Sequence, residues 1–248
     1  MHRRQFLRLG YAAAPLIFSG PWFGASTPPA IGSKFNSDGS FRRFPGNTII
    51  CHVPPDSAAF QVLLQVRARF AARPFSHCLT LMPPASYHMT IFEGVVNEVR
   101  RSGLWPLDMS ADSPLDSCNR LFFKKLQGFD LGCDPPFRLV PDFVPDTFIH
   151  LRPFDDQEER KLRDLRDRLS RLLLLRGPNH ETYQFHITLA YLVKWMTPEE
   201  RADYAKTREE CASILRNSLS VIELGAPEFC FFQNMAAFDP QLLLKHKV

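Results

Sequence analysis

The chain lacks the sequence features of several protein classes. No apolar run reaches the roughly 18 residues that a membrane-spanning helix needs, which excludes a polytopic membrane protein. There is no Gly-x-Ser-x-Gly, no His-Glu-x-x-His, no Walker loop and no Gly-x-Gly-x-x-Gly. These absences argue against a serine hydrolase, a zinc protease, a P-loop enzyme and a dinucleotide-binding enzyme.

Net charge is also small once the first residues are set aside. The 248 residues carry a formal net charge of +4. Residues 1–26 contain Arg3, Arg4 and Arg8 and no acidic residue, and removing them leaves 27 basic and 26 acidic residues. A non-specific nucleic-acid binder should carry a basic surplus on its folded domain. We therefore expect no stable nucleic-acid binding.

The six cysteines form no C-x-x-C and no paired Cys/His spacing typical of a zinc site. An exported protein could join some of them as disulfides. Cys51, Cys78 and Cys230 lie in apolar surroundings, however, and could equally be small buried side chains. The sequence leaves both states open.

Residues 1–26 are typical of an export signal. A twin-arginine start at Arg3 and Arg4 precedes a mildly apolar stretch at 9–18, and small residues follow at 24–26. A twin-arginine leader directs a folded protein across the bacterial inner membrane. We therefore expect this segment to engage the twin-arginine export machinery and the protein to be periplasmic; the alternative is a cytoplasmic protein with an ordinary N-terminus.

The remaining chain predicts the same order of elements twice. Residues 27–46 are rich in Gly, Ser and Pro and indicate a linker followed by an arm. The first half then shows a strand at 48–53, a helix from a cap at 56 or 57 to about 73, a strand at 87–92 and a helix at 113–128. The second half shows a strand at 147–151, a helix from a cap at 155 to about 176, a strand at 183–192 and a helix from a capping box at 197–200 to about 219.

Short strands at 220–224 and 229–232 close the domain, which we place at 47–240, with 241–248 as a C-terminal tail. The corresponding strands of the two halves begin 40 and 39 positions before a shared motif. This weak internal repeat predicts an α+β fold of two pseudo-symmetric lobes, each with an antiparallel sheet and helices, and a cleft between them.

The shared motif is His-x-Thr followed by an aliphatic residue. It occurs as His88-Met89-Thr90-Ile91 and as His186-Ile187-Thr188-Leu189. Strand side chains alternate between faces, so each strand presents a His–Thr pair on one face and apolar residues on the other. Chance predicts fewer than one His-x-Thr in this composition, which makes two copies at matched positions a specific signal.

Two histidines across a cleft can act as an acid/base pair. One neutral imidazole removes a proton while the other, protonated, supplies one. The hydroxyls of Thr90 and Thr188 are uncharged donors that suit the non-bridging oxygens of a phosphate. Such a pair predicts a bell-shaped pH dependence near the ordinary histidine pKa of about 6.5.

Other polar residues are weaker candidates. His52 on the first strand and His150 on the equivalent strand of the second half could edge the cleft, although satisfied strand histidines are the simpler interpretation. Asn179 and His180 lie before the second motif strand, where a capping or loop role is favoured over ligand contact. Among the many phenylalanines one could stack on a base, yet core packing explains most of them.

At these motifs the sequence resembles the 2H phosphoesterase superfamily, which includes bacterial 2′-5′ RNA ligase-like proteins and cyclic nucleotide phosphodiesterases. The stretches GSKFNSDGSFRRFPGNTIICHV, MPPASYHMTIFEGV and NHETYQFHITLAYL are similar to an uncharacterised bacterial branch. The resemblance covers roughly residues 32–240. It implies a bilobal α+β fold and metal-independent phosphodiester chemistry, with His88 and His186 as acid and base and Thr90 and Thr188 as phosphate donors.

The function expected from these observations is hydrolysis or reversible ligation of a phosphodiester, in particular a 2′,3′-cyclic phosphate on a nucleotide or RNA end. Neither a metal nor a cofactor is expected. Two alternatives stay open: a non-catalytic module that binds a phosphorylated ligand in the same cleft, and a metal-dependent hydrolase that uses some of the eight histidines.

Overall fold

The structure is a computed structural model that describes residues 27–247. The predicted leader at 1–26 lies outside the described residues. Within residues 27–247, no helix combines the length and apolar character that crossing a membrane requires.

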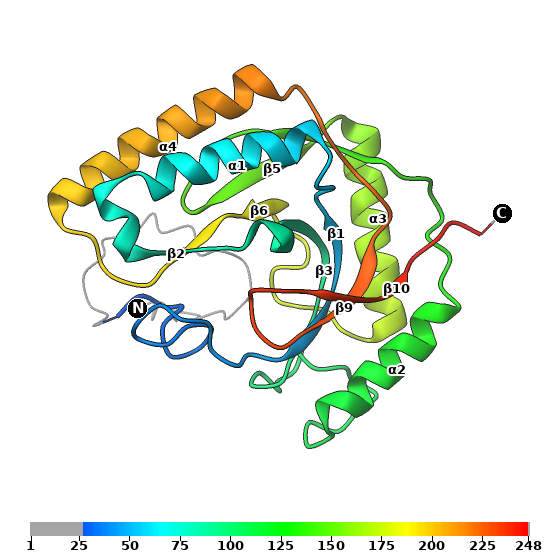
Figure 1. Cartoon of the computed structure of the whole chain (residues 1–248). Helices are drawn as coiled ribbons and strands as arrows, with labels where there is room; N and C mark the ends of the chain where they lie inside the picture. The colour runs from blue at the N-terminus through cyan, green and yellow to red at the C-terminus, as the bar shows by residue number, and fades with distance from the viewer. Residues whose placement is uncertain (1–26, 248) are drawn as a thin grey trace, which may run out of the picture.

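In this part of the chain, eight strands form one curled antiparallel sheet in the order β10-β9-β1-β3-β6-β5-β4-β8 (Figure 1). The strands are β1 (Gly46–His52), β3 (His88–Val96), β4 (Phe137–Pro141), β5 (Phe148–Pro153), β6 (His186–Thr188), β8 (Ile222–Leu224), β9 (Glu228–Phe232) and β10 (Asp239–Leu243). A second, two-stranded sheet pairs β2 (Leu79–Leu81) with β7 (Ala190–Leu192).

The large sheet consists of two four-stranded halves. One half contains β10, β9, β1 and β3, and the other contains β6, β5, β4 and β8. The halves join where Met89 of β3 pairs with Ile187 of β6. The α+β fold with two similar halves is therefore confirmed, with one addition: the last two strands return to the half that the chain built first.

Four helices flank the sheet in the described residues: α1 (Ala58–Ala71), α2 (Leu115–Gln127), α3 (Asp156–Leu173) and α4 (Pro198–Ser218). The cap of α1 at Ser57, the cap of α3 at Asp155 and the capping box of α4 at Thr197 all form as predicted. α2 begins at Leu115, so the predicted start at residue 113 is too early. Pro114 stands at the cap position and makes no side-chain cap hydrogen bond. α1 packs against α4 and α2 against α3, so each helix pair combines one helix from each half (Figure 1).

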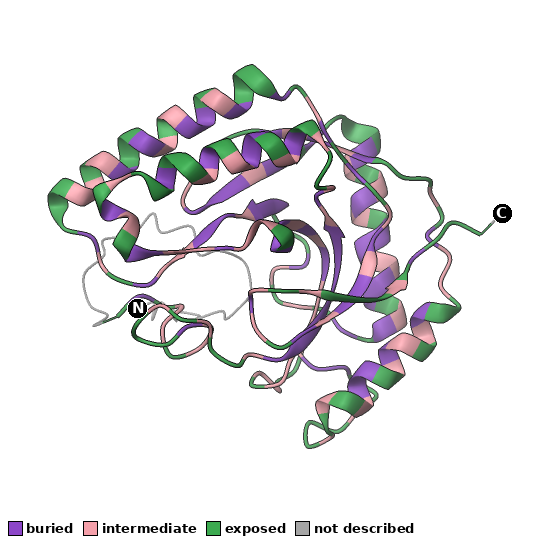
Figure 2. Cartoon of the chain, in the orientation of Figure 1, coloured by how far each residue is buried: buried purple, intermediate pink, exposed green. Residues whose placement is uncertain are grey.

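The core lies between the helices and one face of the sheet (Figure 2). The leucine stripe of α3 faces this core, and its members Leu162, Leu165 and Leu169 are fully buried. The same core contains Met89 and Ile187 from the two motif strands. Strand side chains alternate between faces, so the motif histidines lie on the opposite face of the sheet.

The strand predicted across 183–192 is two strands in different sheets. β6 ends at Thr188, and the amides of Leu189 and Ala190 both donate to the carbonyl of Thr147. The carbonyl of Leu189 then accepts from Met82, next to β2. The break occurs because the chain changes its pairing partner, which local alternation does not reveal.

The arm that precedes β1 is packed onto the domain. Phe35 is fully buried and its ring contacts those of Phe41 and Tyr191. The hydroxyl of Thr80 on β2 donates to the carbonyl of Gly39 at 2.6 Å. At the other end, the pairing of β10 continues past residue 240 to Leu243. All six cysteines are unpaired.

Candidate active site

The two His-x-Thr motifs lie on adjacent strands of the sheet. In an antiparallel pair, residues directly opposite each other share a face. The register through Met89 and Ile187 therefore places His88 beside Thr188 and Thr90 beside His186. All four line one cavity of about 480 Å³. The residues that the sequence singled out are thus brought together at a single concave site.

Each motif histidine is held by the same contact. His88 lies with Nδ1 2.7 Å from the carbonyl oxygen of Ser86, and His186 lies with Nδ1 2.8 Å from the carbonyl oxygen of Gln184. A carbonyl can only accept, so Nδ1 of both rings carries the proton and donates it. Nε2 is left as the nitrogen that can take up or release a proton. The matched contacts make the two rings equivalent in orientation and tautomer.

Burial keeps both imidazoles neutral in the free protein. It lowers the pKa of His88 and that of His186 to about 4 each. The hydrogen bond from each Nδ1 opposes this shift, and the positive charge of Lys34 adds to it. A neutral ring in a dry site is a suitable general base, and an anionic ligand would favour protonation of its partner.

A second pair of histidines lies directly outside the first. His52 is opposite His88 across β1 and β3, and His150 is opposite His186 across β5 and β6. His52 bonds Glu228 with Nδ1 and Oε2 2.5 Å apart. These two outer histidines do not line the cavity. They are neighbours of the motif histidines within the sheet.

The arm supplies a cation that the sequence reasoning missed. Lys34 lines the cavity and its Nζ lies 3.3 Å from the hydroxyl oxygen of Tyr191 and 4.8 Å from the centre of that ring. No carboxylate lies within ion-pair distance of Lys34 among residues 27–247. Its only sequence signal is a lysine in an arm rich in Gly and Ser, which alone predicts nothing.

Aromatic rings fix the motif histidines from the side. The ring of Phe238 lies edge-on to His88 with ring centres 4.3 Å apart, and Phe148 lies edge-on to His186 at 5.3 Å. Phe238 comes from the turn between β9 and β10. Both contacts limit rotation of the imidazoles while excluding water from them.

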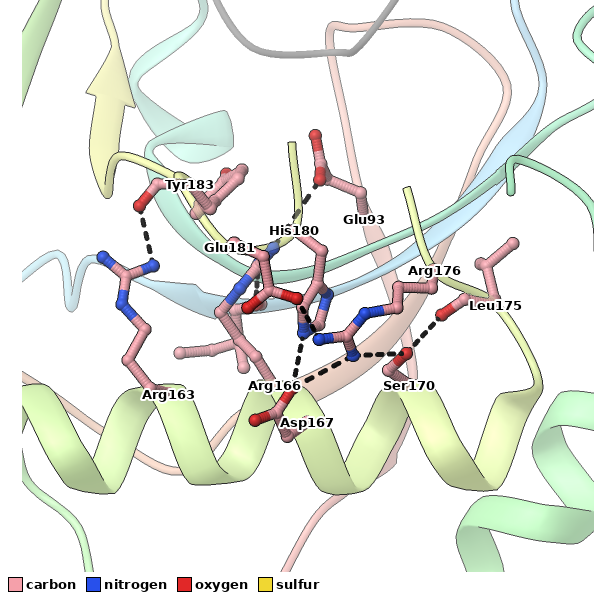
Figure 3. A network of polar contacts seen from close by, with 11 residues as sticks. Glu93, Arg163, Arg166, Asp167, Ser170, Leu175, Arg176, His180, Glu181 and Tyr183 are labelled. Atoms are coloured by element: carbon pink, nitrogen blue, oxygen red, sulfur yellow. Dashed lines mark hydrogen bonds and ion pairs between the residues drawn. The ribbon is translucent and has the colours of Figure 1, made fainter. Parts of the chain in front are cut away.

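A buried arginine, Arg166, also lines the cavity. It belongs to a polar network between α3 and the residues above it (Figure 3). Arg166 of α3 is 1% exposed and donates to the carbonyl of Ile91 at 2.6 Å. Its guanidinium lies 3.9 Å from the centre of the Tyr183 ring and 3.8 Å from a carboxylate oxygen of Glu93. Burial raises the pKa of Glu93 and the charge of Arg166 opposes that rise.

His180 belongs to the same polar network rather than to a turn cap alone. It is 5% exposed, lines the cavity, and its Nε2 lies 2.9 Å from Oδ1 of Asp167 on α3 (Figure 3). Asn179 donates toward Glu93 at 3.5 Å. The loop before β6 therefore contributes to the cavity wall.

The donor set around the motif histidines does not resemble a metal centre. In residues 27–247, two groups of three or more His, Cys, Asp or Glu ligand atoms lie close enough to share a metal ion, and neither contains His88 or His186. The nearest polar groups to these rings are backbone carbonyls, threonine hydroxyls and a lysine. This arrangement suits an anion between two imidazoles.

Comparison with known proteins finds a family model that matches part of the chain. Residues 34–147 match the family described as "2H-phosphodiest: Domain of unknown function (DUF1868)". The match includes His88 and Thr90, and the second motif follows it in the chain. The match, the fold and the paired motifs are consistent with the resemblance to the 2H phosphoesterases.

Among solved structures, the chain is similar to a conserved protein of unknown function from Agrobacterium tumefaciens, ATU0111. The two are 29% identical with a TM-score of 0.84, over 89% of this chain and 94% of that one. TT0787 of Thermus thermophilus is 15% identical with a TM-score of 0.37, over 77% of this chain and 87% of that one. No curated protein matches the chain.

Proposed function

We propose that this protein is a metal-independent phosphodiesterase that opens a 2′,3′-cyclic phosphate, or a related phosphodiester at a nucleotide or RNA end. One observation carries the proposal: two imidazoles, His186 buried and His88 half-buried, line the same cavity with a threonine beside each, and each has Nδ1 tied to a backbone carbonyl. The family match supports phosphodiester chemistry in general.

The chemistry needs one proton on the histidine pair. The neutral imidazole takes a proton from water through Nε2 as the water oxygen attacks phosphorus. The protonated imidazole gives its Nε2 proton to the ribose oxygen as the bond from that oxygen to phosphorus breaks. The product is a phosphomonoester with a free hydroxyl, and the single proton has moved from one ring to the other.

The transition-state charge falls on the non-bridging oxygens. Thr90 and Thr188 are placed diagonally across β3 and β6, so each can donate to a phosphate seated between His88 and His186. Lys34 adds the positive charge that the threonines lack. Because the threonines donate hydrogen bonds and Lys34 supplies the positive charge, binding of the phosphate in this cavity needs no metal ion.

A turnover assay with a panel of cyclic phosphates tests the proposal. His88→Ala and His186→Ala should each lower the rate about 10²- to 10⁴-fold, and the double variant should lose much less than the product, because the pair acts as a unit. Thr90→Val or Thr188→Val should each cost roughly 1.5–3 kcal/mol of transition-state binding. His246→Ala, which changes an exposed histidine near the C-terminus, is the matched control.

The same assay after chelation separates the alternatives. Full turnover in EDTA supports the metal-independent enzyme, and turnover lost on chelation and restored by a metal supports a metal-dependent hydrolase. Binding of the cyclic phosphate without turnover supports a non-catalytic module. Wild-type activity in either histidine variant would refute an acid/base pair at these positions.

A further inference from the structure

Three potential metal ligands converge at a place outside the cavity. His77 and Cys78 end the short 3₁₀ helix η1 (Pro74–Cys78), and Glu200 lies in the first turn of α4. The Nε2 of His77 is 3.5 Å from Cys78 Sγ and 3.5 Å from Glu200 Oε1, and Sγ is 3.9 Å from Glu200 Oε2. None of the three residues lines the cavity that holds the motif histidines.

These separations match the edges of a zinc coordination tetrahedron. Zinc binds histidine nitrogen and carboxylate oxygen at about 2.0–2.2 Å and thiolate sulfur at about 2.3 Å. At tetrahedral angles, those bond lengths put nitrogen and oxygen about 3.4 Å apart and sulfur about 3.6 Å from either. Each separation is therefore within a few tenths of an ångström of the required value, with the nitrogen distance measured to Oε1 of Glu200 and the sulfur distance to Oε2.

The histidine is already in the tautomer that a metal needs. Nδ1 of His77 lies 2.9 Å from the carbonyl oxygen of Pro74, which accepts its proton. Nε2 of the neutral ring then directs a lone pair toward Glu200, whose Oε1 directs lone pairs back. A backbone carbonyl that holds the second nitrogen is the usual outer partner of a metal-bound histidine. A cation between the two acceptors, either a proton on the imidazole or a metal ion, removes this opposition.

The other group of three ligands lacks this geometry. His52, Glu228 and Cys230 also gather close together, but His52 Nδ1 and Glu228 Oε2 are 2.5 Å apart. Two atoms at that distance share a proton, because ligands of one metal ion stand more than about 3 Å from each other. That group is a hydrogen-bonded pair beside a buried thiol.

We propose that His77, Cys78 and Glu200 bind a zinc ion that ties η1 to the first turn of α4. The set of imidazole, thiolate and carboxylate suits zinc better than magnesium or calcium, which prefer oxygen ligands. His77 is half exposed, which gives the ion a path from solvent and leaves a fourth position for water. The separated ligands explain why no zinc spacing is visible in the sequence.

Binding would have structural and pH-dependent consequences. The carbonyl of Cys78 accepts the amide of Val193, so the ion would brace the region where β2 and β7 meet α4. The metal–sulfur bond forms as the thiol proton is released to solvent. Because this proton is released, zinc affinity should rise with pH.

Titration of the reduced full-length protein with Co²⁺ alone tests the site. Wild type should develop a thiolate-to-cobalt charge-transfer band together with the visible bands of tetrahedral cobalt, and Zn²⁺ should remove both. Cys78→Ser and His77→Ala should lose the charge-transfer band or weaken cobalt binding at least tenfold. Glu200→Gln preserves the capping box while removing the carboxylate, and it should weaken binding too.

Cys133→Ser and His246→Ala are the matched controls, since they change a half-buried cysteine and an exposed histidine elsewhere. Both controls should retain the wild-type spectrum. Zn²⁺ should raise the Tm of the wild type and of the two controls, but not that of the ligand variants. A wild-type protein without the charge-transfer band, or a band that survives Cys78→Ser, would overturn the proposal. If Cys78→Ser does not fold, the exposed-site variant His77→Ala decides the matter, because an unchanged spectrum there contradicts the ligand set.

Discussion

Met89 and Ile187 are the residues through which the two halves of the large sheet pair, and both are fully buried. Their side chains lie in the core, and the residues on either side of them face the cavity. This one strand pairing therefore sets how His88 and His186 stand relative to each other. The catalytic geometry that we propose depends on core packing directly beneath the site.

The pH dependence of turnover should be displaced toward acid. Burial lowers the pKa of both motif histidines to about 4, and the active state has one proton between them. The profile of kcat/KM reports the free protein, so its optimum should lie well below the ordinary histidine value of about 6.5 and fall toward neutral pH. The motif alone predicts an optimum near 6.5, so the two expectations differ and the measured profile decides between them.

The profile of kcat should lie at higher pH than that of kcat/KM, since the bound phosphate anion favours the protonated ring. Rates measured from pH 3.5 to 8 in buffers of constant ionic strength check both profiles. Coincident optima near pH 6.5 would show that burial does not control these groups. Wild-type protein should remain folded over the range, as circular dichroism can verify.

Replacing Lys34 by methionine should weaken catalysis and shift its pH dependence. The change keeps an unbranched apolar stem and removes the charge that faces the cavity. Loss of one charged hydrogen bond to phosphate corresponds to roughly 1.5–3 kcal/mol, or about tenfold to a hundredfold in kcat/KM. Because the charge of Lys34 lowers the pKa of both histidines, the optimum should also move to higher pH.

Lys206→Met, on the exposed surface of α4, is the control for this change and should leave rate and pH optimum unaltered. A Lys34→Met protein with a reduced rate and an unmoved optimum would mean that the residue acts through packing of the arm. An unchanged rate would remove Lys34 from the site.

Removing the buried guanidinium should destabilise the fold. Arg166→Met leaves the carboxylate of Glu93 without its charge partner and the carbonyl of Ile91 without its donor. Breaking a buried pair on one side costs about 3–5 kcal/mol of unfolding free energy. Adding Glu93→Gln should recover part of the loss, because the neutral amide needs no counter-charge.

Urea denaturation of the single and double variants measures this coupling. Arg171→Met on the exposed face of α3 should change stability by no more than about 0.5 kcal/mol. Equal losses in Arg166→Met and in the double variant would show that the guanidinium acts through its hydrogen bond to Ile91 and its stacking on Tyr183 rather than through Glu93.

Export should depend on the paired arginines of the predicted leader. Arg3→Lys with Arg4→Lys should leave the protein in the cytoplasm of a bacterial host, whereas Arg8→Lys should not. Fractionation of the periplasm followed by immunoblotting makes the comparison. Equal periplasmic amounts of the double variant and wild type would contradict a twin-arginine signal.

Local sequence determined the helices, the faces of the motif strands and the four residues placed at the cavity. Caps at Ser57, Asp155 and Thr197 act within one turn, and a period of two fixes which side of a strand His88 and Thr90 share. Such short-range effects can be predicted because the interacting groups are close in the chain.

Tertiary structure alone decided which segments meet. The pairing of Met89 with Ile187, the return of β9 and β10 to the first half, and the break at Leu189 all depend on partners far away in sequence. The same is true of Lys34, which reaches the cavity because Phe35 anchors the arm, and of Arg166 of α3, which is buried against Ile91 and Glu93 of β3. Periodicity carries no information on such contacts, since their free energy comes from surfaces that exist only after the chain has folded.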